Sequence, residues 1–295
     1  MVNLVRIVLG VLTAIYAVMF GKDYVASSKN GLLEAEEEKS WIKPGIIGFI
    51  ANFGDTLGIG SFAPIVAMSK FSKMKVHDKQ IPGMLNVSCC IPVVTEALLM
   101  TTAIAVEPIT LVSMLAAAGA GSYIGAGIIS KMDEKKIQLV MGIALLATAI
   151  LMFLGLPWIN LMPGGGNEIG LSGVKLVIGI VGNFILGALM TAGIGLYAPC
   201  MALVYFLGMS PKVAFPIMMG SCAVLMPIAS AKFIKEGQFP RKASLAITIG
   251  GVLGVFIAFY LVKSLPMDIL KVLVIIVILY TSFTMLKPVL SKKQA

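Results

Sequence analysis

Two glycine-rich segments contain the residues best suited to bind a small ligand. Each interrupts a long apolar run, and each combines glycines with hydroxyl or amide side chains. Unpaired N–H groups at a helix start attract negative charge, and glycine lets an anion approach the backbone closely. We therefore predict one anion site shared by both segments, with these candidate ligands: Asn52, Thr56, Gly58, Gly60, Ser61, Thr191, Gly193, Gly195 and Tyr197. The alternative is that the glycines only allow helices to pack closely, as small residues do in membranes.

Two carboxylates, Asp55 and Glu96, lie well inside apolar runs. A carboxylate in such a position is energetically costly and usually functional. Asp55 belongs to the first glycine-rich segment, where its negative charge would repel a bound anion unless a proton neutralised it. We therefore predict that Asp55 is a proton-coupling residue. Glu96 either takes part in the same chemistry or lies near the outer end of its helix and reaches water.

The four cysteines, Cys89, Cys90, Cys200 and Cys222, also lie in apolar segments, without the C-x-x-C spacing of a metal site. We interpret them as small buried residues, with a thiol that touches a ligand as the alternative. The single histidine, His77, excludes a histidine-based triad and a multi-histidine metal centre. We expect no metal, no cofactor and no enzymatic activity.

The composition places these residues in a lipid bilayer. Of 295 residues, 58% are hydrophobic and 13% are charged, whereas about 25% are charged in a soluble domain. The mean hydropathy is +0.98. These values argue against a soluble enzyme and a disordered chain. The net charge of +9 comes from basic residues between apolar runs, so it indicates membrane topology rather than nucleic-acid binding.

Nine apolar runs are candidates for membrane helices. Seven have the length of one crossing, about 20 residues: 4–21, 80–102, 108–130, 137–157, 213–231, 243–263 and 268–286. The other two, 44–71 and 173–207, contain the glycine-rich segments. A helix over 173–207 would be about 52 Å long, too long for one crossing of about 30 Å and short for two. Both runs suit half-helices with an unwound tip.

The basic residues indicate how these runs are arranged. Eighteen of the 23 lysines and arginines lie in five polar segments: 22–43, 70–79, 131–136, 232–242 and 287–295. Basic loops collect on the cytoplasmic side, so these segments and the C-terminus should share that side. This requires that 44–71 and 173–207 each enter the membrane and return on the same face. We therefore predict two re-entrant hairpins, one from each side, with tips satisfied by protein or a watery cavity.

An internal repeat supports this arrangement. The segment 56–64 resembles 191–199 at an offset of 135 residues. Each copy would be a hairpin followed by three crossings, which inverts the second copy, a pattern of secondary transporters. We predict an all-α polytopic membrane protein with inverted-topology repeats, divided into an N-terminal helix and polar loop over 1–43, repeat 1 over 44–157, and repeat 2 with a basic tail over 158–295. A parallel repeat with four crossings per copy is the alternative.

The first 43 residues lie outside the predicted repeats. The run 4–21 is long and lacks a clear small-residue cleavage site, so we interpret it as a retained anchor helix rather than a signal peptide. The polar segment 22–43 contains an acidic cluster of Glu34, Glu36, Glu37 and Glu38. We expect a solvated loop or a short surface helix there.

Over about residues 44–286 the chain resembles the TauE/SafE family of sulfite and organosulfonate exporters. The resemblance rests on the glycine-rich hairpin that opens each half, on the sequence at 209–214 and on the sequence at 231–237. Family members often have G-x-G-G-G in the first hairpin, and this chain departs from that pattern at 61–63. The resemblance implies movement of small sulfur-containing anions across a bacterial inner membrane, usually outward.

We accordingly expect a secondary transporter that binds sulfite or an organosulfonate between the two tips at mid-membrane and works by alternating access. Its expected partners are the substrate anion and the lipid bilayer, with a second copy of the chain left open; nucleic acid is not expected. One alternative is a passive anion channel, because re-entrant hairpins occur in channels too. Another is an intramembrane redox enzyme that uses Cys89, Cys200 and Cys222.

Overall fold

The structure is a computed structural model that describes residues 2–57, 59–100, 106–156, 158–159, 161, 167–193, 195–261 and 267–290. The described residues form helices and contain no β-strand, so the prediction of an all-α fold is confirmed for them. The helices are α1 (Val2–Lys29), α2 (Leu32–Ala35), α3 (Ile42–Thr56), α4 (Phe62–Phe71), η1 (Asp78–Gln80), α5 (Ile81–Met100), α6 (Pro108–Ile129), α7 (Glu134–Leu154), α8 (Gly173–Met190), α9 (Tyr197–Phe206), α10 (Pro211–Lys235), α11 (Arg241–Leu261) and α12 (Met267–Leu290).

Six stretches of the described helices are long and apolar enough to cross a membrane: Arg6–Lys29, Asp78–Leu99, Pro108–Ile129, Gly173–Met190, Pro216–Lys235 and Arg241–Tyr260. Large apolar side chains are exposed on their outer faces, for example Ile109 at 67% and Val174 at 75%. A soluble protein rarely exposes so much contiguous apolar surface. The described helices therefore have the character expected of a multi-pass membrane protein.

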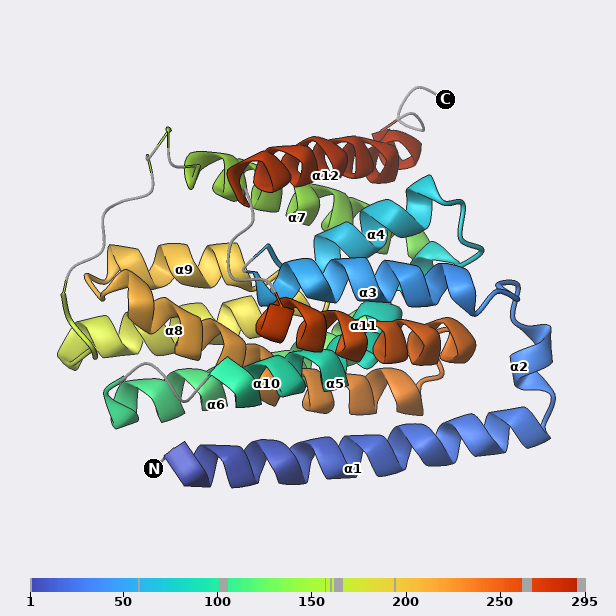
Figure 1. Ribbon diagram of the computed structural model, residues 1–295, viewed down its shortest axis with the longest axis horizontal. Helices are drawn as coiled ribbons and strands as arrows, with labels where there is room; N and C mark the ends of the chain where they lie inside the picture. The colour runs from blue at the N-terminus through green and yellow to red at the C-terminus, as the bar shows by residue number, and fades with distance from the viewer. Residues whose placement is uncertain are drawn as a thin grey trace.

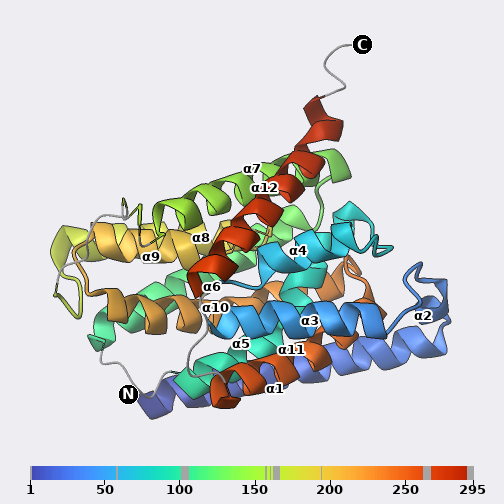
Figure 2. The same cartoon turned by 45° about the horizontal axis from the view of Figure 1, so that its top comes forward.

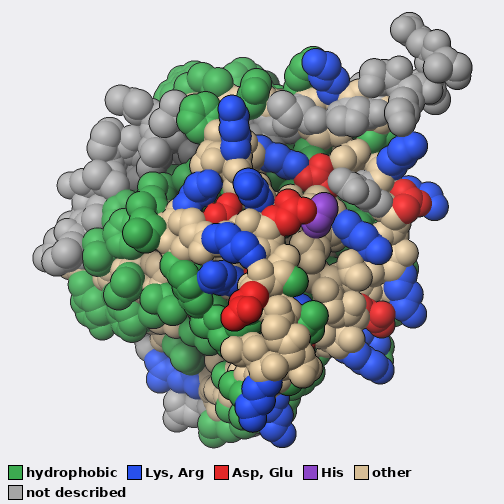
Figure 3. All heavy atoms as spheres, turned by 90° about the vertical axis from the view of Figure 1, so that its right-hand side faces the viewer, with side chains coloured by type: hydrophobic (Ala, Val, Ile, Leu, Met, Phe, Trp, Pro, Cys, Tyr) green, Lys and Arg blue, Asp and Glu red, His purple; other side chains and the backbone are tan. Residues whose placement is uncertain are grey.

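The helices run roughly along the long axis of the molecule, and several of their connections lie at its two ends (Figure 1). The α4–α5 and α10–α11 connections lie at the right-hand end in that view, and the α9–α10 connection lies at the left. Lysine and arginine side chains gather at the right-hand end (Figure 3). The chain thus has one end rich in basic side chains and an apolar flank between its ends.

Two helix breaks interrupt the bundle near the middle of its long axis (Figure 1). At the first, the N–H groups of Leu57 and Ile59 both bond to the carbonyl of Gly54, and Gly60 has a φ of +87°. Gly193 in the second break has a φ of +98°. Glycine adopts this left-handed conformation without strain. The helices after the breaks, α4 and α9, have ten residues each, about 15 Å and half the hydrocarbon core.

The contacts of one half of the chain reappear in the other half. Helix α3 packs against α11 as α8 packs against α6, and α4 contacts α12 as α9 contacts α7 (Figures 1 and 2). Glycines allow the closest of these approaches. A Cβ at Gly48 would lie 2.3 Å from the carbonyl oxygen of Ile247, and one at Gly187 would lie 2.2 Å from that of Ala118. Close helix packing therefore explains these two glycines.

The acidic segment after α1 is tied to the helical bundle. The Glu36 carboxylate accepts hydrogen bonds from the backbone N–H groups of Arg241 at 2.6 Å and Lys242 at 3.0 Å. Asp23 in α1 forms an ion pair with Arg241, with 2.7 Å between Oδ2 and Nε. Two backbone donors at the start of α11 are thus satisfied by a side chain more than 200 residues earlier in the same chain. Glu36 therefore caps the N-terminus of α11.

Glu38 makes a second attachment. Its carboxylate is buried and accepts hydrogen bonds from the backbone N–H groups of Ser40 and Lys75, each at 3.0 Å. The expectation of a solvated loop is therefore wrong for Glu38, which is buried, whereas the alternative of a short surface helix is confirmed by α2, and Glu34 and Glu37 are exposed as expected. The Glu36 and Glu38 carboxylates accept hydrogen bonds from backbone N–H groups that are distant in the chain, at Arg241, Lys242 and Lys75, and the local sequence does not reveal these partners.

Candidate functional site

The carboxylate of Asp55 lies beside the first helix break and is buried, with 2% of the residue exposed. Asn52, Asp55 and Thr56 are spaced three and four residues apart, which places them on one face of α3, and all three are buried. Across the break, the Asp55 carboxylate faces both the backbone N–H and the hydroxyl of Ser61, the residue before α4. The Asp55 carboxylate therefore accepts from hydrogen-bond donors of Ser61 at the start of α4.

Tyr197 joins this carboxylate to the second helix break. It is the first residue of α9, and its hydroxyl faces Asp55. The same hydroxyl donates a hydrogen bond of 3.4 Å to Oε2 of Glu96 on α5. Glu96 is 1% exposed, so the alternative that it reaches water is wrong. Its other carboxyl oxygen, Oε1, has no hydrogen-bond partner, which leaves one buried carboxyl oxygen unsatisfied.

The charge of this cluster is not balanced by a buried cation. The charged residues buried in the described part of the chain are Glu38, Asp55 and Glu96, and no lysine or arginine is among them. Two ionised carboxylates without a cation are costly in apolar surroundings because desolvation and mutual repulsion add together. The cluster is therefore suited to hold at least one proton.

Amide and thiol groups surround the carboxylates. The Asn52 amide donates to the carbonyl of Gly48 at 2.8 Å, whereas its Oδ1 has no partner. The Cys89 thiol faces the side chains of Asn52 and Ser61. Cys222 contacts Met190, with 3.7 Å between the sulfurs. The cysteines are free and buried, and the described residues contain no group of three or more His, Cys, Asp or Glu side chains placed to hold a metal.

The two candidate threonines are engaged within their own helices. Thr56 donates its hydroxyl proton to the carbonyl of Asn52 at 3.0 Å, and Thr191 donates to that of Ala188 at 2.6 Å. Each hydroxyl has one proton. A role for either threonine as a donor to an anion therefore requires its hydroxyl to rotate away from the helix.

The candidate glycines differ in their surroundings. A Cβ at Gly60 or Gly195 would meet no atom within 4 Å, so close packing does not explain these two positions, which correspond to each other in the internal repeat. A Cβ at Gly193 would lie 2.9 Å from Cε of Met141, so this glycine does pack against a side chain. Gly58 lies outside the described residues.

Sequence reasoning missed that Tyr197 connects the two carboxyls. The signal for it is a departure from the repeat. At the offset of 135, Asp55 corresponds to Met190 and Tyr197 corresponds to Phe62. Each half thus contributes a polar group where the other half has an apolar one. Polar residues whose counterparts in the repeat are apolar therefore indicate the buried cluster more specifically than the glycines, which occur in both copies.

Comparison with known families agrees with the resemblance that the hairpin motifs indicate. The family model described as sulfite exporter TauE/SafE matches residues 2–152 and 175–295. The match begins at residue 2, so the expectation that the resemblance covers only about 44–286 is wrong, and the N-terminal helix lies within the matched region. No curated protein and no solved structure matches the chain.

Proposed function

Because the chain belongs to the sulfite exporter TauE/SafE family, we propose that it exports a small sulfur-containing anion, such as sulfite or an organosulfonate, across a bacterial inner membrane. The observation that carries this proposal is the meeting of the two helix breaks, where Tyr197 of the second faces Asp55 of the first. Inverted repeats with broken helices form such central sites in secondary transporters.

The substrate anion would bind between the starts of α4 and α9. Backbone N–H groups in the first turn of a helix have no partner within the helix and carry partial positive charge. Gly60 and Gly195 leave open space beside them, so an anion can approach the backbone from the side where a Cβ would otherwise stand. Ser61, Tyr197 and Asn52 would complete the site with a hydroxyl, a phenol and an amide.

Proton coupling follows from competition for the same donors. Ionised Asp55 faces the Ser61 N–H and hydroxyl, which an incoming anion needs. Protonation of Asp55 removes its negative charge and weakens its hold on these donors, so the anion and the proton favour each other's binding. The two would then move together, and export would be driven by the outward gradient of the anion itself. Tyr197 links Asp55 to Glu96, which offers a second carboxyl for the proton. No covalent chemistry is required.

Alternating access would arise from the two halves of the chain. Each half of the chain makes the same contacts with the other half: α3 packs on α11 as α8 packs on α6, and α4 contacts α12 as α9 contacts α7. This correspondence supports a pseudo-two-fold relation between repeats at about 44–157 and 158–295. In an inverted arrangement α3–α4 and α8–α9 are re-entrant hairpins from opposite faces, and the lysine-rich end with the C-terminus lies in the cytoplasm. Movement of one half against the other would expose the central site to each side in turn.

Transport by the purified chain in liposomes tests this function. We expect saturable uptake of sulfite or an alkanesulfonate that is accelerated by an inward proton gradient and by unlabelled anion on the opposite side. Counter-flow distinguishes a carrier from a passive channel, which would show flux without exchange. Replacement of Cys89, Cys200 and Cys222 by alanine should preserve transport. Loss of transport in a folded variant that lacks these three cysteines would instead favour the redox interpretation.

A further inference from the structure

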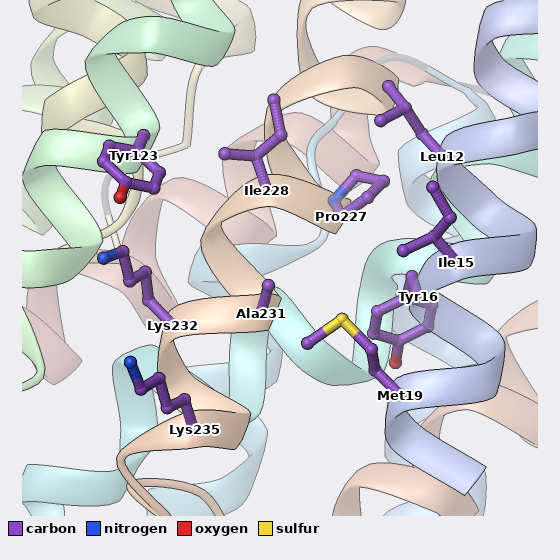
Figure 4. A pocket seen from close by; sticks show the side chains of 10 residues that line it. All are labelled: Leu12, Ile15, Tyr16, Met19, Tyr123, Pro227, Ile228, Ala231, Lys232 and Lys235. Atoms are coloured by element: carbon purple, nitrogen blue, oxygen red, sulfur yellow. The ribbon is translucent and has the colours of Figure 1, made fainter. Parts of the chain in front are cut away.

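A groove of about 440 Å³ lies on the flank of the molecule between α1, α6 and α10, and none of the residues that line it belongs to the carboxylate cluster (Figure 4). Its apolar part is lined by Leu12 and Ile15 of α1 and by Ile228 of α10. Ile15 is 53% exposed, so this wall opens to the surroundings of the protein. A groove of this character, on a helix surface that faces lipid, suits a hydrocarbon chain.

One end of the same groove is basic. Lys232 and Lys235 line it, three residues apart on α10, so they share one face of that helix. The ammonium of Lys232 lies 4.1 Å from the centroid of the Tyr123 ring, which stabilises and orients it. The ion pairs of the described residues involve other side chains, so neither lysine is neutralised by a carboxylate there.

The position of these lysines in the last turn of α10 suits contact with a phospholipid headgroup. Lys235 is the last residue of α10, and α6 ends a few residues beyond Tyr123. Both helix ends belong to the end of the molecule that is rich in basic side chains (Figures 1 and 3). Leu12, Ile15 and Ile228 lie further along the helices, toward the middle of the bilayer. Charge and hydrophobicity are therefore separated along the groove as they are along a lipid molecule.

We propose that this groove binds one anionic phospholipid of the inner leaflet, with its phosphate between Lys232 and Lys235 and an acyl chain along α1 and α10. The two cations select a negative headgroup, and the apolar wall selects an attached acyl chain over a free phosphate. The bound lipid would fill the space between α1, α6 and α10. Transport activity is not required for this binding.

Native mass spectrometry of the intact purified chain tests the proposal with phosphatidylglycerol and phosphatidylcholine of identical acyl chains. We expect the wild-type chain to retain phosphatidylglycerol about tenfold better, an effect consistent with two lysines near an anionic headgroup. K232Q/K235Q should lower retention to the phosphatidylcholine level. The control K131Q/K135Q removes two lysines at the same end that do not line the groove, and it should retain the preference. Glycerol phosphate, which offers a phosphate without acyl chains, should not displace the lipid.

Equal retention of the two lipids by the wild-type chain, or an unchanged preference in K232Q/K235Q, would overturn the proposal. Lys235 is exposed, so K235Q alone should fold and should lower the preference several-fold even if the double variant is unstable. Ala231→Phe, which fills the groove, should reduce retention of both lipids, and undiminished retention would locate the lipid elsewhere. Cross-linking of two chains through Ile15→Cys would place a second copy in the groove and contradict the lipid.

Discussion

The hydroxyl of Tyr197 lies 3.4 Å from Oε2 of Glu96, and these two residues come from different halves of the chain. Tyr197 opens α9 immediately after the second helix break, while Glu96 stands on α5. Because the same hydroxyl also faces Asp55 at the first break, a movement of either break changes the surroundings of both carboxyls. Substitutions of Tyr197 and of the residues around it should therefore change the rate of uptake or the affinity for the anion.

Tyr197→Phe keeps the aromatic ring and removes the hydroxyl that connects Asp55 to Glu96. We expect uptake driven by a proton gradient to fall about tenfold, since one hydrogen bond to a charged group contributes roughly 1.5 kcal/mol. Initial rates in liposomes measure this effect. The control is Tyr260→Phe, because Tyr260 is 62% exposed on α11. Wild-type rates in Tyr197→Phe would show that the phenol does not take part in coupling.

Asp55→Asn makes the first break permanently neutral. In the wild-type chain, anion affinity should weaken as the pH rises, because ionised Asp55 repels the anion and holds the Ser61 donors. In the variant, affinity should be nearly constant over about pH 5–8, and accumulation driven by a proton gradient should be lost. Binding titrations at several pH values and gradient-driven uptake measure both effects. Full gradient-driven accumulation by Asp55→Asn would refute the proton role.

Gly195→Val adds a side chain to the open space beside the second break. No atom lies within 4 Å of a Cβ at this position, so the substitution should leave the fold intact and occupy the space proposed for the anion. We expect anion affinity to fall by more than about tenfold, which corresponds to roughly 1.4 kcal/mol. The matched control is Gly127→Val, at a glycine on α6 that also has open space. Similar affinity in the two variants would argue against an anion at the tip.

Phe71 and Phe206 occupy corresponding places at the ends of α4 and α9, and they are 82% and 72% exposed. If the repeats are inverted, cysteines at these two positions face opposite sides of the membrane. We expect Phe206→Cys to react with a membrane-impermeant reagent from outside, and Phe71→Cys only from the cytoplasmic side. The native cysteines are buried, so they should give little background. Labelling of both positions from one side would support parallel repeats.

Glu38→Gln should destabilise the chain in a pH-dependent way. Burial raises the pKa of Glu38, but hydrogen bonds from the N–H groups of Lys75 and Ser40 and the charge of Lys43 outweigh burial and lower it below the ordinary 4.5. The folded state thus favours the ionised form. The contribution of the ionised Glu38 carboxylate to the free energy of unfolding is complete above the pKa that Glu38 has in the unfolded chain. It is lost as the pH falls through the lowered pKa of the folded state.

We therefore expect Glu38→Gln to lower the Tm by about 2–5 °C near pH 7, with the difference from wild type shrinking below about pH 4. Thermal unfolding in detergent at both pH values measures it. Glu37→Gln is the control, because Glu37 is an exposed neighbour whose contact is with the exposed His77. An equal Tm difference at both pH values would show that the Glu38 carboxylate charge does not stabilise the loop.

The sequence by itself determined the membrane environment, the all-helical fold and the positions of the two helix breaks. These properties depend on local information: the length of apolar runs, the sparsity of charge, and glycines followed by proline near Thr56 and Thr191. The spacing of Asn52, Asp55 and Thr56 is local information of the same kind, because residues three and four positions apart share one face of any α-helix. The basic loops predicted a sidedness that cysteine labelling at Phe71 and Phe206 can test.

Only the tertiary structure decided which polar groups meet. The Tyr197 hydroxyl reaches Glu96 across 101 positions of the chain, and the Glu36 carboxylate reaches the Arg241 N–H across 205. A hydrophobic pattern specifies that a helix face is buried, but it does not specify which other helix covers it. Partners of that kind are chosen by the packing of α3, α5 and α9 around one centre. For this reason the candidate ligands were visible in the sequence, whereas the link between the two carboxyls appeared only in the folded chain.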